Sequence, residues 1–109
     1  MEWNSYAQLG NCQLLSNHAD LATDPLIKAR AAASQIWWVH FTLAGALGLK
    51  GDLDGGKAAL AESLKLRPEF NSIGQYLALK PFGYASPKYR ELEDHTLLEG
   101  LRRLGFPGT

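Results

Sequence analysis

The chain contains only one cysteine, Cys12, among its 109 residues. A single thiol excludes an internal disulfide framework and suits a reducing compartment, so we expect the protein in the cytoplasm. An excess of one charge is also missing, because eleven basic and eleven acidic side chains balance to a net charge of zero. This balance offers no charge asymmetry that would attract a phosphate backbone, and we expect no nucleic-acid partner.

Secretory and membrane-spanning segments are missing as well. Residues 1–4 have neither the basic nor the apolar region of a signal peptide. Residues 31–49 carry no Asp, Glu, Lys or Arg and approach the length of about 20 apolar residues that spans a bilayer. Polar Ser34, His40 and Thr42 interrupt this stretch, and the repeat described below explains it as a helix junction followed by a buried helix. We therefore expect no membrane partner.

Residue groupings typical of metal and catalytic sites are not visible either. His18, His40 and His95 are far apart, no pair of them has the spacing of metal ligands on one helix, and Cys12 has no second thiol. Cys12 is therefore expected as a small core residue. No nucleophile-elbow motif supports a Ser-His-Asp triad. We expect no metal ion, no cofactor and no enzymatic activity, since a small-molecule enzyme would need a cluster of titratable groups.

What the sequence does contain is a repeat with a period of about 34 residues. Trp3 recurs as Trp37, and Leu26 recurs as Leu60. A fixed period of this size is typical of stacked helical hairpins, in which each repeat packs on its neighbours. The sequence therefore predicts an all-α fold, a right-handed stack of antiparallel helix hairpins with a C-terminal capping helix.

One domain, residues 1–109, is expected to contain the whole stack. Its predicted parts are a repeat over residues 3–36, a second over 37–70, a partial third over 71–80 and a capping helix over 86–105. Turns are predicted at Asn17-His18 and Gly51-Asp52, between the two helices of each full repeat. Pro25 falls within a predicted helix, where it predicts a kink or a helix that restarts at Asp24.

The capping helix has clear signals at both ends. Ser86 is the expected N-cap, Pro87 the first helical residue and Gly105 the stop. The apolar stripe of this helix consists of Tyr89, Leu92, Thr96, Leu97, Leu101 and Leu104. We expect the stripe to lie across the open end of the stack, with the charged face of the helix toward solvent.

The second period carries the tetratricopeptide (TPR) pattern most fully, with Trp37, Leu43-Ala44 at the helix contact, Leu60 and Pro68. Gly56 and Ser63 stand where this family has alanine. Residues 37–107, above all the ending EGLRRLGFP, resemble the C-terminal TPR region of bacterial adenylate cyclase-like and winged-helix regulatory proteins. This resemblance implies a TPR α-solenoid that follows a catalytic or DNA-binding domain, and no catalytic residue is carried over.

Stacked hairpins form a concave groove lined by the first helix of each repeat. The residues expected at groove positions, proposed as a protein-binding site, are Asn4, Ala7, Gln8, Asn11, Trp38, Phe41, Thr42, Gln75 and Tyr76. Gly45 and Gly48 would leave a flat floor there, which suits the close approach of another backbone. These positions carry no lysine or arginine, unlike TPR grooves that hold a C-terminal carboxylate.

Two functions follow as hypotheses. In the first, the groove binds a peptide or helix of a partner protein, with the aromatic side chains as anchors. In the second, the module self-associates as a homodimer and brings together copies of an upstream catalytic domain. Trp3, Tyr6 and Leu9, on the open N-terminal end of the stack, would then form the contact between the copies.

Overall fold

The computed structural model describes residues 2–79 and 87–108, and all regular secondary structure in these two ranges is helical. The helices are α1 (Trp3–Leu15), α2 (Ala19–Ala32), α3 (Trp37–Lys50), α4 (Leu53–Leu66), α5 (Ile73–Leu79), α6 (Pro87–Glu93), the π-helix η1 (Asp94–Leu98) and α7 (Glu99–Arg103). The predicted all-α class is confirmed. The predicted N-cap Ser86 lies outside the described residues.

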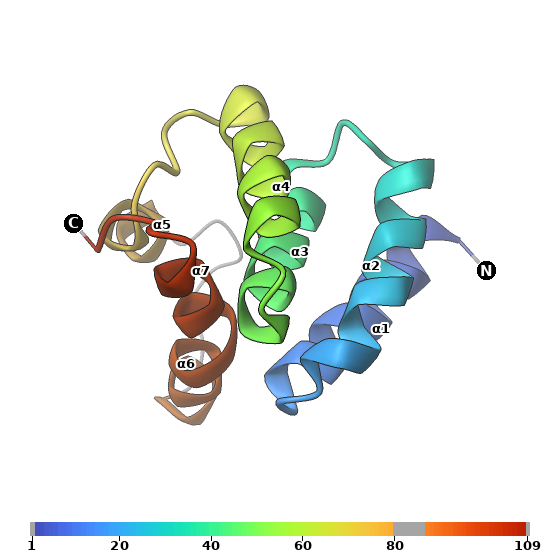
Figure 1. Ribbon diagram of the computed structural model, residues 1–109, viewed down its shortest axis with the longest axis horizontal. Helices are drawn as coiled ribbons and strands as arrows, with labels where there is room; N and C mark the ends of the chain where they lie inside the picture. The colour runs from blue at the N-terminus through green and yellow to red at the C-terminus, as the bar shows by residue number, and fades with distance from the viewer. Residues whose placement is uncertain (1, 80–86, 109) are drawn as a thin grey trace.

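The helices pack in sequential pairs. Contacts join α1 to α2 and α3 to α4, and α2 also lies against α3. Figure 1 shows the α3–α4 pair in the middle of the molecule, with α1 and α2 on one side and α5, α6 and α7 on the other. The two helices within each predicted full repeat therefore contact each other.

Short turns with left-handed residues connect the paired helices. Asn17, between α1 and α2, has φ 63°, and Gly51, after α3, has φ 97°. Asp52 then caps α4 by accepting a hydrogen bond from the Gly55 amide at 3.1 Å. Gly105, with φ 85°, follows α7. Both of the glycines lie where a side chain would strain the backbone.

The prediction of a helix restart at Pro25 is wrong. Pro25 lies inside α2, which is helical from Ala19 to Ala32 without interruption. A proline cannot donate to the carbonyl four residues earlier, here that of Leu21. Leu21 is 54% exposed, so water can reach this part of the helix, while the Pro25 ring is buried with the apolar face of α2.

An aromatic cluster forms the centre of the core. Trp37 stacks on Phe70 with ring centroids 4.3 Å apart, and Phe41 stacks on Tyr76 at 4.8 Å. Phe106, after the last helix, contacts Phe41 edge-on at 5.9 Å. The cluster joins α3 to α5 and to the C-terminal segment, so large buried rings connect parts of the chain that are far apart in sequence.

The helices α6, η1 and α7 follow one another directly, and together they form the C-terminal helix. This helix was expected across the open end of the stack. In the structure η1 and α7 lie along α3, on the opposite side of the α3–α4 pair from α2 (Figure 1), and η1 also contacts α1. Glycines allow the close contact between these helices. A Cβ atom on Gly48 would overlap the Gly100 carbonyl, and one on Gly100 would overlap the Gly45 carbonyl. The close approach expected over Gly45 and Gly48 is therefore made by the chain's own backbone.

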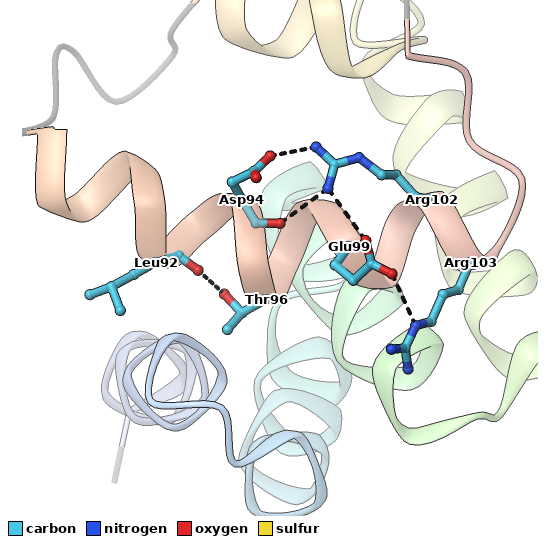
Figure 2. Close-up of polar contacts among 6 residues, drawn as sticks. All are labelled: Leu92, Asp94, Thr96, Glu99, Arg102 and Arg103. Carbon is cyan, nitrogen blue, oxygen red and sulfur yellow. Dashed lines mark hydrogen bonds and ion pairs between the residues drawn. The ribbon is translucent and has the colours of Figure 1, made fainter.

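The π-helical turn changes which residues the C-terminal helix buries. Leu92, expected in the apolar stripe, is 41% exposed, whereas Glu93 and Leu98 are buried. Figure 2 shows the Thr96 hydroxyl donating to the Leu92 carbonyl, at 2.6 Å. A π turn is wider than an α turn, and the buried face of this helix includes residue 93 in place of Leu92.

Charged side chains on the outside of the C-terminal helix bind one another and α3. Arg102 forms an ion pair with Asp94 and donates to the Asp94 carbonyl at 3.2 Å. Glu99 accepts from Arg103 at 3.3 Å (Figure 2). Arg103 also donates to the Leu49 carbonyl at 3.3 Å, near the C-terminal end of α3. This contact places a positive charge at the negative end of the α3 dipole.

Within the described ranges, no helix is both long and apolar enough to cross a bilayer. The uncharged residues 31–49 belong to the end of α2, a short connection and α3.

Candidate functional site

A cavity of about 220 Å³ lies between α1, α3, α5 and the C-terminal helix, and we call it the hollow. Its lining residues are Gln8 and Asn11 from α1, Trp38 and Thr42 from α3, Tyr76 from α5, Glu93 from α6 and Leu97 from η1. Gln8 is exposed, so the hollow reaches solvent beside α1. Five of the nine residues predicted at groove positions meet here.

The other four predicted groove residues do not line the hollow. Ala7 is fully buried among Ala29 and Val39, and Phe41, at 1% exposure, belongs to the aromatic cluster. Both were expected on the groove surface, but α2 and α3 cover Ala7, while Phe41 lies beneath Tyr76 and Phe106. Asn4 and Gln75 are exposed outside the hollow.

The most unusual group in the hollow is the Glu93 carboxylate. Its residue is only 8% exposed, and its Oε2 accepts a hydrogen bond from the Tyr76 hydroxyl at 3.0 Å. The Tyr76 ring is held by stacking on Phe41, which fixes the direction of the hydroxyl. No lysine or arginine of the described chain forms an ion pair with Glu93.

Burial changes the acidity of this group. Desolvation raises the pKa of the Glu93 carboxyl above its usual value of 4.5, because a charged carboxylate loses hydration in the interior. The hydrogen bond from Tyr76 and the positive charge of Arg90 act in the opposite direction. The burial effect is the largest of the three, so the net result is a raised pKa for the Glu93 carboxyl.

Aromatic and amide groups line the same cavity as the carboxylate. Trp38 is half-buried, and its ring lies 6.1 Å from the ring of Trp3 in a tilted arrangement. Gln8 and Asn11 contribute amides from successive turns of α1, each with both donor and acceptor atoms. The hollow therefore combines one acid, two aromatic rings and two amides, a set suited to binding a polar group with an apolar stem.

The side chains described around the hollow carry few groups that titrate near neutral pH. None of the residues described as lining it is a histidine, cysteine, lysine or arginine. Within residues 2–79 and 87–108, no three His, Cys, Asp or Glu side chains lie close enough to hold a metal ion. Cys12, expected in the core, is exposed on α1, because the buried side of α1 is formed by Ala7, Gly10 and Leu14.

Glu93 was missed in the sequence, although a signal for it was present. The leucines of the C-terminal helix at 97, 101 and 104 are buried, and their spacing continued back by one turn reaches residue 93. A glutamate in phase with a leucine stripe indicates a buried acid or a polar contact. The choice of Leu92 for the stripe concealed this pattern.

Comparisons with protein-family models, with curated proteins and with solved structures find no match to this chain. The TPR assignment therefore rests on the repeat period and on the residues quoted for it, and it stays a prediction.

Proposed function

We propose that the chain is a non-catalytic protein-binding module whose hollow receives a side chain of a partner protein. The observation that carries the proposal is the meeting of Gln8, Asn11, Trp38, Thr42 and Tyr76 in one cavity. Trp and Tyr are enriched among residues that dominate binding energy, and amides beside them fix the orientation of a bound group.

The size of the hollow narrows what can bind. At about 30 Å³ for each water, about 220 Å³ holds about seven water molecules. This space admits one side chain but no helix. The surface of α3 at Gly45 and Gly48, where the backbone of a partner peptide or helix was expected, contacts the chain's own C-terminal helix. The proposed contact is therefore a partner surface that inserts one residue.

Residues 37–107 resemble the C-terminal TPR region of bacterial regulatory proteins, and this resemblance suggests in which kind of protein the module would act. It would make the chain a cytoplasmic regulatory module that follows a catalytic or DNA-binding domain. The hollow would then connect that domain's activity to the presence of a partner.

A peptide display library tests the proposal. Peptides selected on the wild-type protein should bind Gln8→Trp at least about tenfold more weakly, because a large ring at the exposed rim closes the hollow. Asn4→Trp is the matched control, because it adds the same ring one turn earlier on α1, outside the hollow. Equal binding to both variants, or a library without any peptide that senses Gln8→Trp, would overturn the proposal.

Self-association as a homodimer is the alternative. Leu9, Leu21 and Ile27 are exposed on α1 and α2, which favours a contact between two copies. The ion pair of Asp24 with Lys28, at 3.6 Å, interrupts the apolar residues of α2. A molar mass equal to that of a dimer across a range of concentrations, measured by light scattering, would favour this alternative.

A further inference from the structure

We propose that the hollow binds an alkylammonium group, as carried by a lysine side chain or by a free primary amine. The inference deepens the proposed function, on which it rests, because it names the chemistry of the side chain that enters. It is built on the Glu93 carboxylate, the Trp38 and Tyr76 rings and the amides of Gln8 and Asn11.

The charge of the hollow selects a cation. Glu93 is more than nine-tenths buried and lines the cavity, and its Oε2 is held in place by the Tyr76 hydroxyl. A buried carboxylate requires a positive or hydrogen-donating partner. The described lining contains no basic residue that could repel a cation or attract an anion. An incoming ammonium would supply the counter-charge that burial of Glu93 calls for.

The aromatic residues favour the same kind of ligand. The electron-rich face of a tryptophan attracts a cation and also covers the methylene groups next to it. Gln8 and Asn11 can accept the remaining ammonium N–H groups through their side-chain oxygens. A carboxylate, an aromatic ring and amide oxygens together satisfy both the charge and the three donors of an ammonium group.

An ammonium fits better than a guanidinium. Arginine binds carboxylates through two parallel hydrogen bonds and needs both oxygens in an open plane. In Glu93 the Oε2 atom already accepts from Tyr76, which favours a ligand that needs a single point of contact. The flexible four-carbon stem of lysine also suits a cavity of about 220 Å³.

The test is a titration of the isotope-labelled protein followed by NMR, at constant ionic strength. The probe is n-butylammonium, with n-butanol and n-butylguanidinium as comparison ligands. The ammonium should shift the indole signal of Trp38 and the amide signals of Gln8 and Asn11.

We expect n-butanol to bind at least about tenfold more weakly, because it lacks the charge. The guanidinium should also bind more weakly than the ammonium. Binding of n-butanol as tight as that of the ammonium would overturn the inference.

Glu93→Gln is the variant that tests the carboxylate. Glutamine keeps the size of the side chain and an oxygen that can accept from Tyr76, and the NMR spectrum reports whether the fold is retained. We expect butylammonium to bind about tenfold more weakly to Glu93→Gln. Glu91→Gln, which removes the same charge from an exposed position on α6, should bind like the wild type. Unchanged binding to Glu93→Gln would contradict the inference.

Arg90→Gln provides a second test that leaves Glu93 in place. Arg90 is exposed, and its charge acts on the Glu93 carboxyl. At a pH where a pH titration shows Glu93 to be ionised in both proteins, removing this nearby cation should tighten butylammonium binding about twofold to threefold. Weaker binding would show that the ammonium does not sit beside Glu93.

Peptides distinguish the sources of the ammonium group and separate this inference from the proposed function. A short acetylated peptide with a central lysine that binds more tightly than butylammonium would identify a partner protein as the source. Binding of butylammonium alone would keep the ammonium site and reject the protein-binding function. Display-selected peptides that require an open hollow yet bind Glu93→Gln normally would keep the function and reject the ammonium inference.

Discussion

Helices α1 and α3 are the first helices of the two predicted repeats, yet their surroundings differ. The described helix α1 buries only Ala7, Gly10 and Leu14, whereas residues 39–48 of α3 are buried without a gap. Helix α1 packs mainly on α2, but α3 is covered by α2, α4 and the C-terminal helix. The number of neighbours, set by position in the chain, decides how much of a repeat helix is buried.

Two pairs of equivalent residues show how the sequence accommodates this difference. Leu14 of α1 corresponds to Gly48 of α3, and Asn11 corresponds to Gly45. The glycines let the backbone of the C-terminal helix approach α3 at Gly100. On α1 the amide of Asn11 remains beside the hollow. Of these two α1 residues, Asn11 lines the hollow, whereas Leu14 is buried in the core.

The largest change in stability is expected when Gly48 of α3 receives a side chain, as the corresponding position of α1 has in Leu14. In Gly48→Ala the new methyl group would overlap the Gly100 carbonyl, so the two backbones must move apart. We expect a loss of about 3 kcal/mol in the free energy of unfolding, at the upper end of the range for overpacked cores. Denaturation with urea measures the loss.

Gly55→Ala is the control for this change. Gly55 lies in the first turn of α4, and its nearest neighbour is the exposed side chain of Asp52, which can rotate. Alanine is favoured over glycine in a helix by up to about 1 kcal/mol, which offsets a weakened cap. A loss in Gly48→Ala no larger than in Gly55→Ala would mean that the C-terminal helix does not press on α3.

The position of the C-terminal helix is also where the sequence alone was least informative. The turns at Asn17 and Gly51 depend on neighbouring residues and could be predicted from local signals. The contact of Gly48 with Gly100 joins segments that are far apart in the chain. A repeat period assigns faces to a helix, but it does not say which later segment covers a face. For that reason Phe41 was expected on the surface and lies in the core.

In the candidate site, too, residues placed by local spacing were predicted, and residues brought in by a distant segment were not. Trp38 and Thr42 could be placed on one side of α3 from helical spacing, and both line the hollow. Glu93 and Leu97 come from the C-terminal helix and were not expected there. Helical spacing back from Leu97 reaches Glu93, but spacing within one helix does not show that this helix meets α1 and α3 at a cavity.

A smaller change, this time a gain in stability, is expected from a substitution at Ser63 of α4. Ser63 is fully buried, and its hydroxyl oxygen has no hydrogen-bond partner among the described residues. The residue 34 positions earlier, in the first predicted repeat, is Ala29, which is equally buried. Ser63→Ala removes an unsatisfied polar group, so the free energy of unfolding should rise by about 1 kcal/mol.

The reciprocal change, Ala29→Ser, tests whether the two hairpins are equivalent at this position. It places a hydroxyl in the buried contact of α2 and should cost about 1–3 kcal/mol by the same argument. The urea midpoints of unfolding of both variants show whether a hydroxyl at this position lowers stability in each hairpin. A loss of stability in Ser63→Ala would show that the hydroxyl has a partner, such as a carbonyl of its own helix.

The smallest effect concerns the acid that lies between α1 and α3. Burial raises the pKa of Glu93 above 4.5 in the folded protein, so the folded state binds more protons than the unfolded state just above that pH. The free energy of unfolding contributed by Glu93 is therefore highest below 4.5 and falls as the pH rises through the raised pKa. Glu93→Gln should remove this fall, and urea unfolding between about pH 4 and pH 8 measures it. Glu91→Gln, an exposed change on the same helix, should retain the wild-type slope. A wild-type curve parallel to that of Glu93→Gln would show that the carboxylate is as well solvated in the fold as in the unfolded chain.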